Sequence, residues 1–307
     1  MKAFRYTGKP ISKNGAYVDA SIDEYHAGTL CDGLSISASG LSVVIDSPAH
    51  FWDTCAWNVE AEPEDGEKEE YVFGRAAHTY AFERDQFNKR FVVIPKDAPK
   101  KPTSAQIKAK KPSDETIKQI EWWDEFKAQI NGRHLIKPDE FYDIEKMSKV
   151  LANDEWARAA FGEEGAAELT LAYKDEVTGI WVLSRPDWLS RRIVDYKTAA
   201  CAQPELWSRR SFDRYVIQAA ISSIALLKAT GERRDEVFHV IQEKKRPYVV
   251  QVARWTPEHL QFGAVKVRNA LDRLARCRDS GVWPAYRGEP FDVIPPYEVR
   301  KLLELQA

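Results

Sequence analysis

The pattern of apolar and polar positions between residues 168 and 199 predicts β-strands in the middle of the chain. The segment from Glu168 to Lys174 alternates with a period of two, and a polar turn that ends at Gly179 follows it. Two more short strands, rich in β-branched and aromatic residues, extend to Ala199 and are joined by the polar residues 190–192. The pattern therefore predicts three consecutive antiparallel strands, of which the last two form a hairpin.

Apolar residues at helical spacing predict helices on both sides of these strands. The predicted helices lie within residues 34–53, 71–83, 113–126, 140–161, 212–230 and 256–279. A short helix is expected to open at Gln203-Pro204, and Ser211 is expected to cap the longer helix that Gly231 ends. A second hairpin at 236–254 is predicted to extend the sheet.

The composition is that of a folded protein. The chain has 307 residues, of which 44% are hydrophobic, with 10 Trp, 12 Tyr and 13 Phe, and this is sufficient for a substantial core. We expect one domain, residues 1–307, in which 34–165 are mainly helical and 166–290 contain the sheet and its flanking helices. No apolar run is long enough to cross a bilayer and the first residues lack a signal peptide, so we expect a cytoplasmic protein without a membrane partner.

The four cysteines, Cys31, Cys55, Cys201 and Cys277, are widely separated and form no C-x-x-C pair. This spacing suggests neither a zinc site nor a disulfide framework. We therefore expect four buried free thiols.

Positive charge is concentrated in the segment that contains the predicted hairpin. The net charge of the chain is −2, but residues 185–287 hold 20 Lys and Arg residues against 11 Asp and Glu residues. The rest of the chain holds 25 against 36. Such an asymmetry is typical of a protein that binds a phosphate backbone, and solvated helix faces are the alternative interpretation.

Two carboxylates and a lysine converge on the predicted hairpin. Asp195 and Lys197 share one face of the last strand, whereas Tyr196 points to the other. A three-residue loop at 190–192 places Asp187 opposite Asp195, while a two-residue loop would pair Asp187 with Val194 and turn Asp195 away. The chemistry therefore favours the three-residue loop, or a bulge. Oxygen ligands of this kind favour a hard divalent cation, with Mg²⁺ as the natural candidate and Mn²⁺ as the alternative. The simpler interpretation is a surface hairpin with a salt bridge, but Asp195 follows two apolar residues on a strand that should be buried.

Two segments resemble the motif of the PD-(D/E)XK nuclease superfamily: Arg185-Pro-Asp-Trp-Leu189 and Ile193-Val-Asp-Tyr-Lys-Thr198. Within that superfamily the chain is most similar to the RecE-type exonucleases, to which Ser47-Pro-Ala-His-Phe51 adds a further likeness. The resemblance covers roughly residues 34–290. It implies an α/β fold with a restriction-endonuclease-like core, in which helices flank a central mixed β-sheet, and an N-terminal helical elaboration.

The resemblance also implies roles for residues outside the hairpin. His78 follows Gly74 in a G-x-x-x-H pattern on a predicted helix, which in RecB-like and RecE-like nucleases brings a histidine near the metal. Glu168 matches an acidic residue at the start of a strand, with a solvated strand edge as the alternative. Gln218 matches the glutamine of the Q-x-x-x-Y motif of RecB-like nucleases, but Ser222 stands where that motif has tyrosine. This departure weakens an assignment to the helicase-linked branch.

These residues together predict metal-dependent hydrolysis of a DNA phosphodiester bond. The predicted metal-site residues are Asp187, Asp195, Tyr196 through its carbonyl oxygen, and His78, which would serve an adjoining or second metal position with Glu168. Lys197 would orient the attacking water and stabilise the transition state. Gln218 would hold Lys197 or the water in place.

The resemblance implies 5′-to-3′ digestion of linear double-stranded DNA from its ends in phage or prophage recombination. It also implies a ring-shaped homo-oligomer and a companion single-strand annealing protein. Two alternatives are a catalytically inactive DNA-binding module on the same fold and a PD-(D/E)XK endonuclease; retention of Asp187, Asp195 and Lys197 argues against the inactive module. We expect no iron–sulfur cluster, because the nucleases that hold one need a cysteine cluster near the C-terminus.

Overall fold

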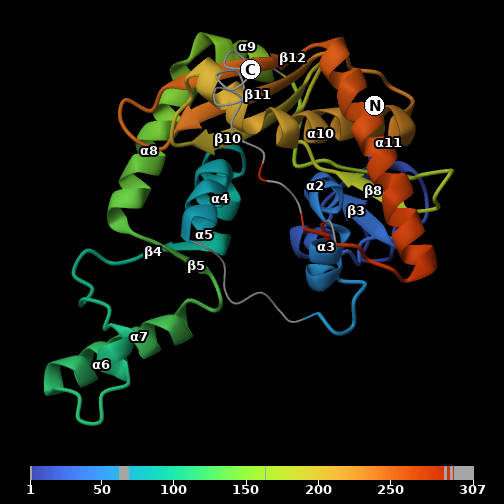
Figure 1. Ribbon diagram of the computed structural model, residues 1–307. Helices are drawn as coiled ribbons and strands as arrows, with labels where there is room; N and C mark the ends of the chain where they lie inside the picture. Colours follow the sequence, from blue (N-terminus) through green and yellow to red (C-terminus); the bar gives the residue numbers. More distant parts are fainter. Residues whose placement is uncertain (1, 62–68, 163, 287–288, 291–292, 294–307) are drawn as a thin grey trace, which may run out of the picture.

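The computed structural model describes residues 2–61, 69–162, 164–286, 289–290 and 293. Its strands form two mixed five-stranded sheets and one two-stranded sheet, with helices packed around them (Figure 1). This arrangement confirms the predicted α/β fold with mixed sheet flanked by helices. Within the described residues, no helix is long and apolar enough to span a membrane.

The first sheet combines strands from both ends of the sequence. In spatial order its strands are β1 (Phe4–Arg5), β2 (Gly15–Val18), β7 (Thr170–Lys174), β8 (Trp181–Ser184) and β3 (Ser35–Ser37). The strand predicted at 168–174 is shorter in the structure, Thr170–Lys174, because Glu168 lies in a left-handed bend before it; the predicted turn that ends at Gly179 is present. The sequence analysis did not predict β1, β2 and β3, because strands of two to four residues are too short to display a period of two.

The second sheet carries the predicted hairpins. In spatial order its strands are β12 (Val250–Trp255), β11 (Val237–Glu243), β10 (Ile193–Ala199), β9 (Trp188–Leu189) and β6 (Ala166–Ala167). The hairpin predicted at 236–254 is formed by β11 and β12. Ile193 pairs with Leu189 and Val194 with Trp188, so the loop between β9 and β10 holds three residues, 190–192, as predicted.

The prediction of three consecutive antiparallel strands is wrong in one respect. The segment before the 190–192 loop is not one strand, because β8 belongs to the first sheet and β9 to the second. Arg185 and Pro186 lie at the crossing between the two sheets, and Pro186 has no N–H to donate to a strand ladder. Asp187 therefore lies in the irregular segment between β8 and β9 and not within a strand.

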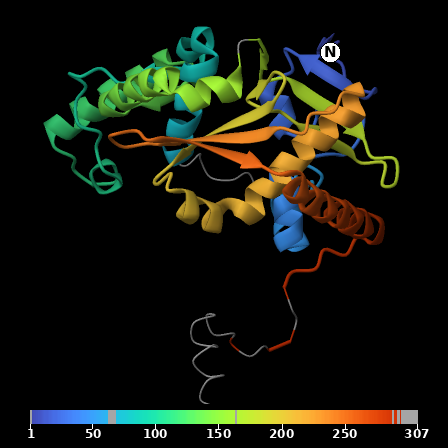
Figure 2. The same ribbon diagram turned by 90° about the horizontal axis from the view of Figure 1, so that it is seen from above.

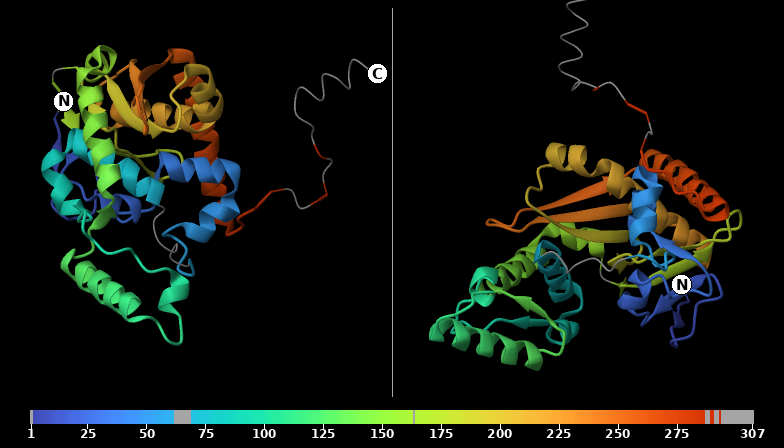
Figure 3. Two further views of the ribbon diagram at one scale, coloured as in Figure 1. Left: turned by 90° about the vertical axis from the view of Figure 1, so that its left-hand side faces the viewer. Right: turned by 60° about the horizontal axis from the view of Figure 1, so that its bottom comes forward.

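Helices account for most of the described chain between residues 38 and 161 and for two long segments near its end. They are α1 (Ile22–His26), α2 (Ala38–Asp46), α3 (Pro48–Thr54), α4 (Glu69–Phe82), α5 (Arg84–Arg90), α6 (Ser104–Ile107), α7 (Asp114–Gln129), α8 (Pro138–Asn153), α9 (Glu155–Phe161), α10 (Pro204–Thr230) and α11 (Pro257–Ser280). The two-stranded sheet pairs β4 (Phe91–Val93) with β5 (His134–Ile136). Helices α6 and α7 lie at one end of the molecule, away from both five-stranded sheets (Figures 1 and 3).

Three predicted helical segments are divided differently in the structure. The segment 140–161 forms two helices, α8 and α9, because the side chain of Asp154 accepts the N–H of Ala157 and caps the second helix. Ser47 divides the segment 34–53 into α2 and α3, since its hydroxyl accepts the N–H of His50 and caps a new helix that opens with Pro48. Ser211 does not cap a helix, because α10 is continuous from Pro204 to the left-handed Gly231. The predicted short and long helices are therefore one.

The second sheet lies between two layers of helices (Figure 2). Successive side chains of β10 point alternately toward one layer and the other. Ile193 packs in a core cluster with residues of α10, whereas Val194 and Tyr196 pack in a cluster with residues of α8 and α9. The alternation of side chains along a strand consequently turns Asp195 and Lys197 toward α10. Among the cysteines, Cys31, Cys55 and Cys277 are buried as expected, but Cys201 is only half-buried.

Gly263 allows α11 to pack directly against α10. A Cβ atom at this position would lie 2.5 Å from the carbonyl oxygen of Val216 and 2.7 Å from Cβ of Ala220. Helix propensity favours alanine over glycine by about 1 kcal/mol, but overpacking of a close contact costs about 1–3 kcal/mol. We therefore expect Gly263→Ala to lower the free energy of unfolding, measured by urea denaturation.

The control for this prediction is Val265→Ala on the exposed side of the same helix, where 56% of the residue surface is accessible. Its effect should stay within about 0.5 kcal/mol. An unchanged or higher stability of Gly263→Ala would contradict the close approach of the two helices.

Candidate active site

Strand β10 directs an aspartate and a lysine into the interface with α10. Asp195 is fully buried, and its Oδ1 accepts a hydrogen bond of 2.9 Å from Nε2 of Gln218 on α10. The Nζ atom of Lys197 lies 3.6 Å from the same Oδ1 and 5.6 Å from the centre of the Tyr215 ring. Gln218 thus contacts the carboxylate that lies next to Lys197, and its expected role of holding Lys197 or a water molecule in place stays a prediction.

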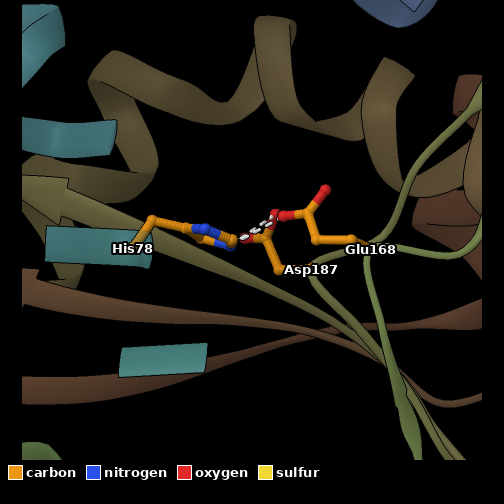
Figure 4. A group of neighbouring side chains, drawn as sticks. All are labelled: His78, Glu168 and Asp187. Carbon is orange, nitrogen blue, oxygen red and sulfur yellow. Dashed lines mark ion pairs between the residues drawn. The ribbon is translucent and has the colours of Figure 1, made fainter. Parts of the chain in front are cut away.

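A second group of side chains meets beside this strand (Figure 4). His78 comes from α4, Glu168 from the link between β6 and β7, and Asp187 from the link between β8 and β9. Nε2 of His78 lies 3.1 Å from Oδ1 of Asp187 and 3.3 Å from Oε1 of Glu168. Within the described chain, these three residues offer ligand atoms that all lie within 4.8 Å of one another. Asp195 lies outside this group of three, and its role in the metal site stays a prediction.

The local fold explains why Asp187 and His78 meet. The pairing register places Asp187 opposite Asp195, just beyond the last paired residues of β9 and β10. Its Oδ2 accepts the N–H of Tyr196, which has no β9 residue opposite it. Helix α4 approaches β10 closely at Gly74, where a Cβ atom would lie 3.3 Å from Oγ1 of Thr198. His78 follows one helical turn later and so reaches Asp187.

Glu168 reaches the site through a backbone bend that links the two sheets. Its φ angle is +55°, in the left-handed region that a non-glycine residue rarely occupies. The bend ends β6 and starts β7, and the backbone N–H of Glu168 donates to the carbonyl oxygen of Asp187 at 3.3 Å. The alternative of a solvated strand edge does not hold, because only 16% of the Glu168 side chain is exposed. Backbone strain of this kind is concentrated at functional sites.

Arg185 is a residue of this site that the sequence analysis did not assign. Its Nε donates to Oε2 of Glu168 at 2.6 Å, and its Nη1 donates to the carbonyl oxygen of Ala20 at 2.9 Å. The side chain is nine-tenths buried. Its place directly before Pro186 and Asp187 was the one feature of the sequence that linked Arg185 to the site. The contact with Ala20 could not be predicted, because Ala20 is far away in the sequence. Arg185 therefore orients the carboxylate that faces His78.

The backbone of Tyr196 contacts Asp187, whereas its side chain does not face the site. Its side chain points to the opposite face, where the hydroxyl group donates to Oε1 of Gln242 at 2.6 Å. The N–H and C=O of one strand residue point to the same edge of the strand. Because the N–H of Tyr196 donates to Asp187, its carbonyl oxygen faces the same side.

The two aspartates have opposite electrostatic environments. Burial raises the pKa of Asp187, but the neighbouring charges of His78 and Lys197 outweigh burial and hold this pKa at about 2. Burial also acts on Asp195, and here Lys197 does not compensate for it, so the pKa is raised to about 7. Burial lowers the pKa of His78, whereas Asp187 and Glu168 raise it, with a net rise to about 9. Asp187 is thus held as an anion, and Asp195 lacks sufficient positive charge around it.

These residues fit a divalent cation. Two carboxylates and an imidazole are ligands that Mg²⁺ and Mn²⁺ accept, and Mn²⁺ tolerates the nitrogen ligand better. Oδ2 of Asp195 is buried and has no hydrogen-bond partner among the described residues. A buried carboxylate oxygen without a partner is costly, and a cation would supply the missing interaction.

Comparisons with known proteins concern the family and the fold of the chain. Residues 37–292 match the family model described as PDDEXK-like domain of unknown function (DUF3799). A protein from Eubacterium rectale, described as a candidate exonuclease, has a crystal structure that aligns with a TM-score of 0.56 at 16% identity. The alignment covers 92% of this chain and 95% of that chain, and at this identity it concerns the fold alone.

A second solved structure is more distant. An alkaline exonuclease from Laribacter hongkongensis aligns with a TM-score of 0.27 at 12% identity, over 66% of this chain and 91% of that chain. This likeness is too weak to support an argument. None of the curated proteins matches the chain.

Proposed function

We propose that this chain, which belongs to the family of PDDEXK-like domains (DUF3799), is a divalent-metal-dependent nuclease that degrades linear double-stranded DNA from its ends. The observation that carries the proposal is the meeting of His78, Glu168 and Asp187 beside a strand on which Asp195 and Lys197 share one face. Five residues from α4, the two inter-sheet links and β10 thus surround one region. A surface salt bridge alone does not account for so many buried charges.

In this proposal the metal site consists of side chains and one backbone group. The ligands would be Asp187, Glu168 and His78, with Asp195 and the carbonyl oxygen of Tyr196 on the neighbouring strand. When bound, the cation would lower the pKa of a water molecule and offset the negative charge that develops on the phosphate. The supporting observation is that Oδ2 of Asp195 is buried and has no hydrogen-bond partner in the part of the chain that the structure describes.

Lys197 would act on the phosphate or on the attacking water. Burial disfavours its ammonium group, but Asp195 and Asp187 outweigh burial and raise the pKa of Lys197. The side chain is 18% exposed, so it is both charged and within reach of a substrate. A charged donor in a partly dry site stabilises a developing oxyanion more than it would in water. Gln218 would position this group indirectly, by fixing the Asp195 carboxylate next to it.

DNA is the proposed substrate because of the charge distribution. Residues 185–287, which include Asp187, Asp195 and Lys197, contain an excess of Lys and Arg, and such residues neutralise backbone phosphates. Backbone contacts position DNA without specifying its sequence. The resemblance to RecE-type enzymes favours action at ends over action at internal sites, with the endonuclease as the second candidate.

Linear duplex DNA should be degraded progressively in Mg²⁺ or Mn²⁺, while covalently closed circles of the same sequence should survive. The reason is that an end-dependent enzyme needs a terminus to thread into its site. The measurement is gel electrophoresis of both substrates with and without the cation, with the same circle linearised as the matched control. Discrete fragments from the closed circle would favour the endonuclease. DNA binding without cleavage of either substrate, in either cation, would favour the inactive module.

The finer features of this proposal follow from the resemblance in sequence. They are a 5′-to-3′ direction of digestion, a preference for a 5′-phosphorylated end, a ring-shaped homo-oligomer, and a single-strand annealing protein as partner in phage or prophage recombination. Duplexes labelled at the 5′ ends or at the 3′ ends distinguish the direction, because digestion from 5′ to 3′ releases the 5′ label early and the 3′ label late. Analytical ultracentrifugation of the purified protein measures its mass in solution and so the number of subunits in the oligomer.

A further inference from the structure

A buried histidine faces Asp195 from the neighbouring strand. His239 on β11 pairs in register with Asp195 on β10, and because the two strands are parallel their side chains lie on the same face. Both residues are fully buried. Nε2 of His239 lies 3.9 Å from Oδ2 of Asp195, and neither atom has a hydrogen-bond partner among the described residues. Two unsatisfied polar atoms thus point toward each other in the core.

The tautomer of His239 is fixed by its second neighbour. Nε1 of Trp255 lies 2.8 Å from Nδ1 of His239, and an indole N–H can only donate. Nδ1 is therefore the acceptor, and the proton of the neutral ring is on Nε2. A second proton on Nδ1 would face the indole N–H, which is also a donor, so the ring is neutral in this arrangement. Nε2 consequently carries a hydrogen that points toward Asp195, and this hydrogen prevents Nε2 from binding a metal.

We propose that His239 is a positioning residue that donates its Nε2–H to Oδ2 of Asp195 when that carboxylate binds the cation. The inference rests on the proposed function only in taking Asp195 as a metal ligand. Gln218 already holds Oδ1, so a bond from His239 fixes the carboxylate at both oxygens. A carboxylate oxygen has two lone-pair sites, which leaves one for the cation. The two atoms are 3.9 Å apart, so the proposal requires Nε2 and Oδ2 to come closer, to hydrogen-bond distance, when the cation binds.

A purely structural role is the competing explanation. The imidazole ring of His239 packs in an aromatic group, with ring centres 5.1 Å from Tyr215, 5.5 Å from Trp255 and 5.9 Å from Trp207. In that case the ring would stabilise the fold without any effect on the affinity for cations. The two explanations differ in whether the Nε2–H group itself is needed.

Two substitutions separate these explanations. His239→Asn keeps an acceptor for the indole N–H of Trp255 but has no donor that reaches Asp195. His239→Gln is longer, so its amide can place an N–H near the position of Nε2. Both remove the aromatic ring, so both should lower the melting temperature to a similar degree. The positioning role predicts that only His239→Asn loses cation affinity.

The measurement is Mn²⁺ binding to the full-length protein by titration calorimetry, without DNA. We expect His239→Asn to weaken binding about 10- to 100-fold, the usual effect of removing a partner of a metal ligand, and His239→Gln to recover most of this loss. Equal affinities in the wild type and His239→Asn, or equal losses in both variants, would overturn the inference. If the wild type binds Mn²⁺ but leaves DNA intact, the proposed function fails, while the ratio of affinities still decides the role of His239.

An independent measurement concerns the tautomer. The ¹⁵N chemical shifts of the His239 ring should show protonation at Nε2 alone in the wild type. Trp255→Phe keeps an aromatic ring but removes the N–H donor, so we expect a mixture of tautomers and weaker Mn²⁺ binding. Protonation at Nδ1 in the wild type would overturn the proposal, since Nε2 would then have no hydrogen to donate.

Discussion

Asp187→Asn should reduce metal-dependent DNA cleavage by about a thousand-fold or more, because a cation contributes several kcal/mol to the reaction and each 1.4 kcal/mol corresponds to a tenfold change in rate. Asparagine has the size of aspartate and can still accept the N–H of Tyr196, so the fold should be kept. It lacks the negative charge that attracts His78 and would attract a cation. The loss should appear in Mn²⁺ affinity, measured without DNA, as well as in the rate of cleavage.

The control is Asp213→Asn. Asp213 has an exposed side chain and an ion pair of 2.7 Å with Lys266 on the surface. An exposed pair of this kind contributes little, so this variant should bind cations and cleave DNA like the wild type. Cleavage by Asp187→Asn at a rate near that of the wild type would reject Asp187 as a ligand.

The sequence was sufficient to predict the hairpin geometry around this residue. A period of two along residues 193–199 places Asp195 and Lys197 on one face, and their contact of 3.6 Å agrees with this. The need to bring Asp187 beside Asp195 favoured the three-residue loop, which the strand pairing contains. Both inferences depend on local chain geometry, which the residues themselves determine.

The division of the strand before that loop could not be predicted in this way. Residues 181–184 and 188–189 have the composition of strands, but they belong to different sheets. The sheet to which each strand belongs depends on partners outside the hairpin, such as β3, which pairs with β8 from far away in the sequence, and β6, which pairs with β9. The contact between Arg185 and Glu168 and the position of His239 opposite Asp195 are consequences of the same long-range pairing.

Helix α10 shows tertiary packing overriding a local signal. Ser211 is a good capping residue, and its neighbours gave no reason for a helix to run through it. Yet one face of α10 is buried against the core, with Trp207 on one side of Ser211 and Val216 on the other. Burial of both turns outweighs the weak preference of serine for a helix end. The continuous helix then carries Tyr215 and Gln218 to Lys197 and Asp195.

Lys197→Met should reduce the turnover number about 100- to 1,000-fold, the usual effect of removing one group that stabilises an oxyanion. Methionine retains an apolar stem that can pack against Tyr215, so the substitution removes mainly the charge. Removing a positive charge beside Asp195 and Asp187 does not weaken their attraction for a cation. Mn²⁺ affinity should therefore stay the same or increase while turnover at saturating cation falls.

This combination distinguishes Lys197 from the metal ligands, because Asp187→Asn should lose both properties together. Lys228→Met is the matched control, since Lys228 is half-exposed and pairs with the exposed Glu176 at 3.4 Å. Its turnover and cation affinity should match those of the wild type. If Lys197→Met instead lost Mn²⁺ affinity but recovered full turnover at saturating cation, Lys197 would support the metal site and would not act in the transition state.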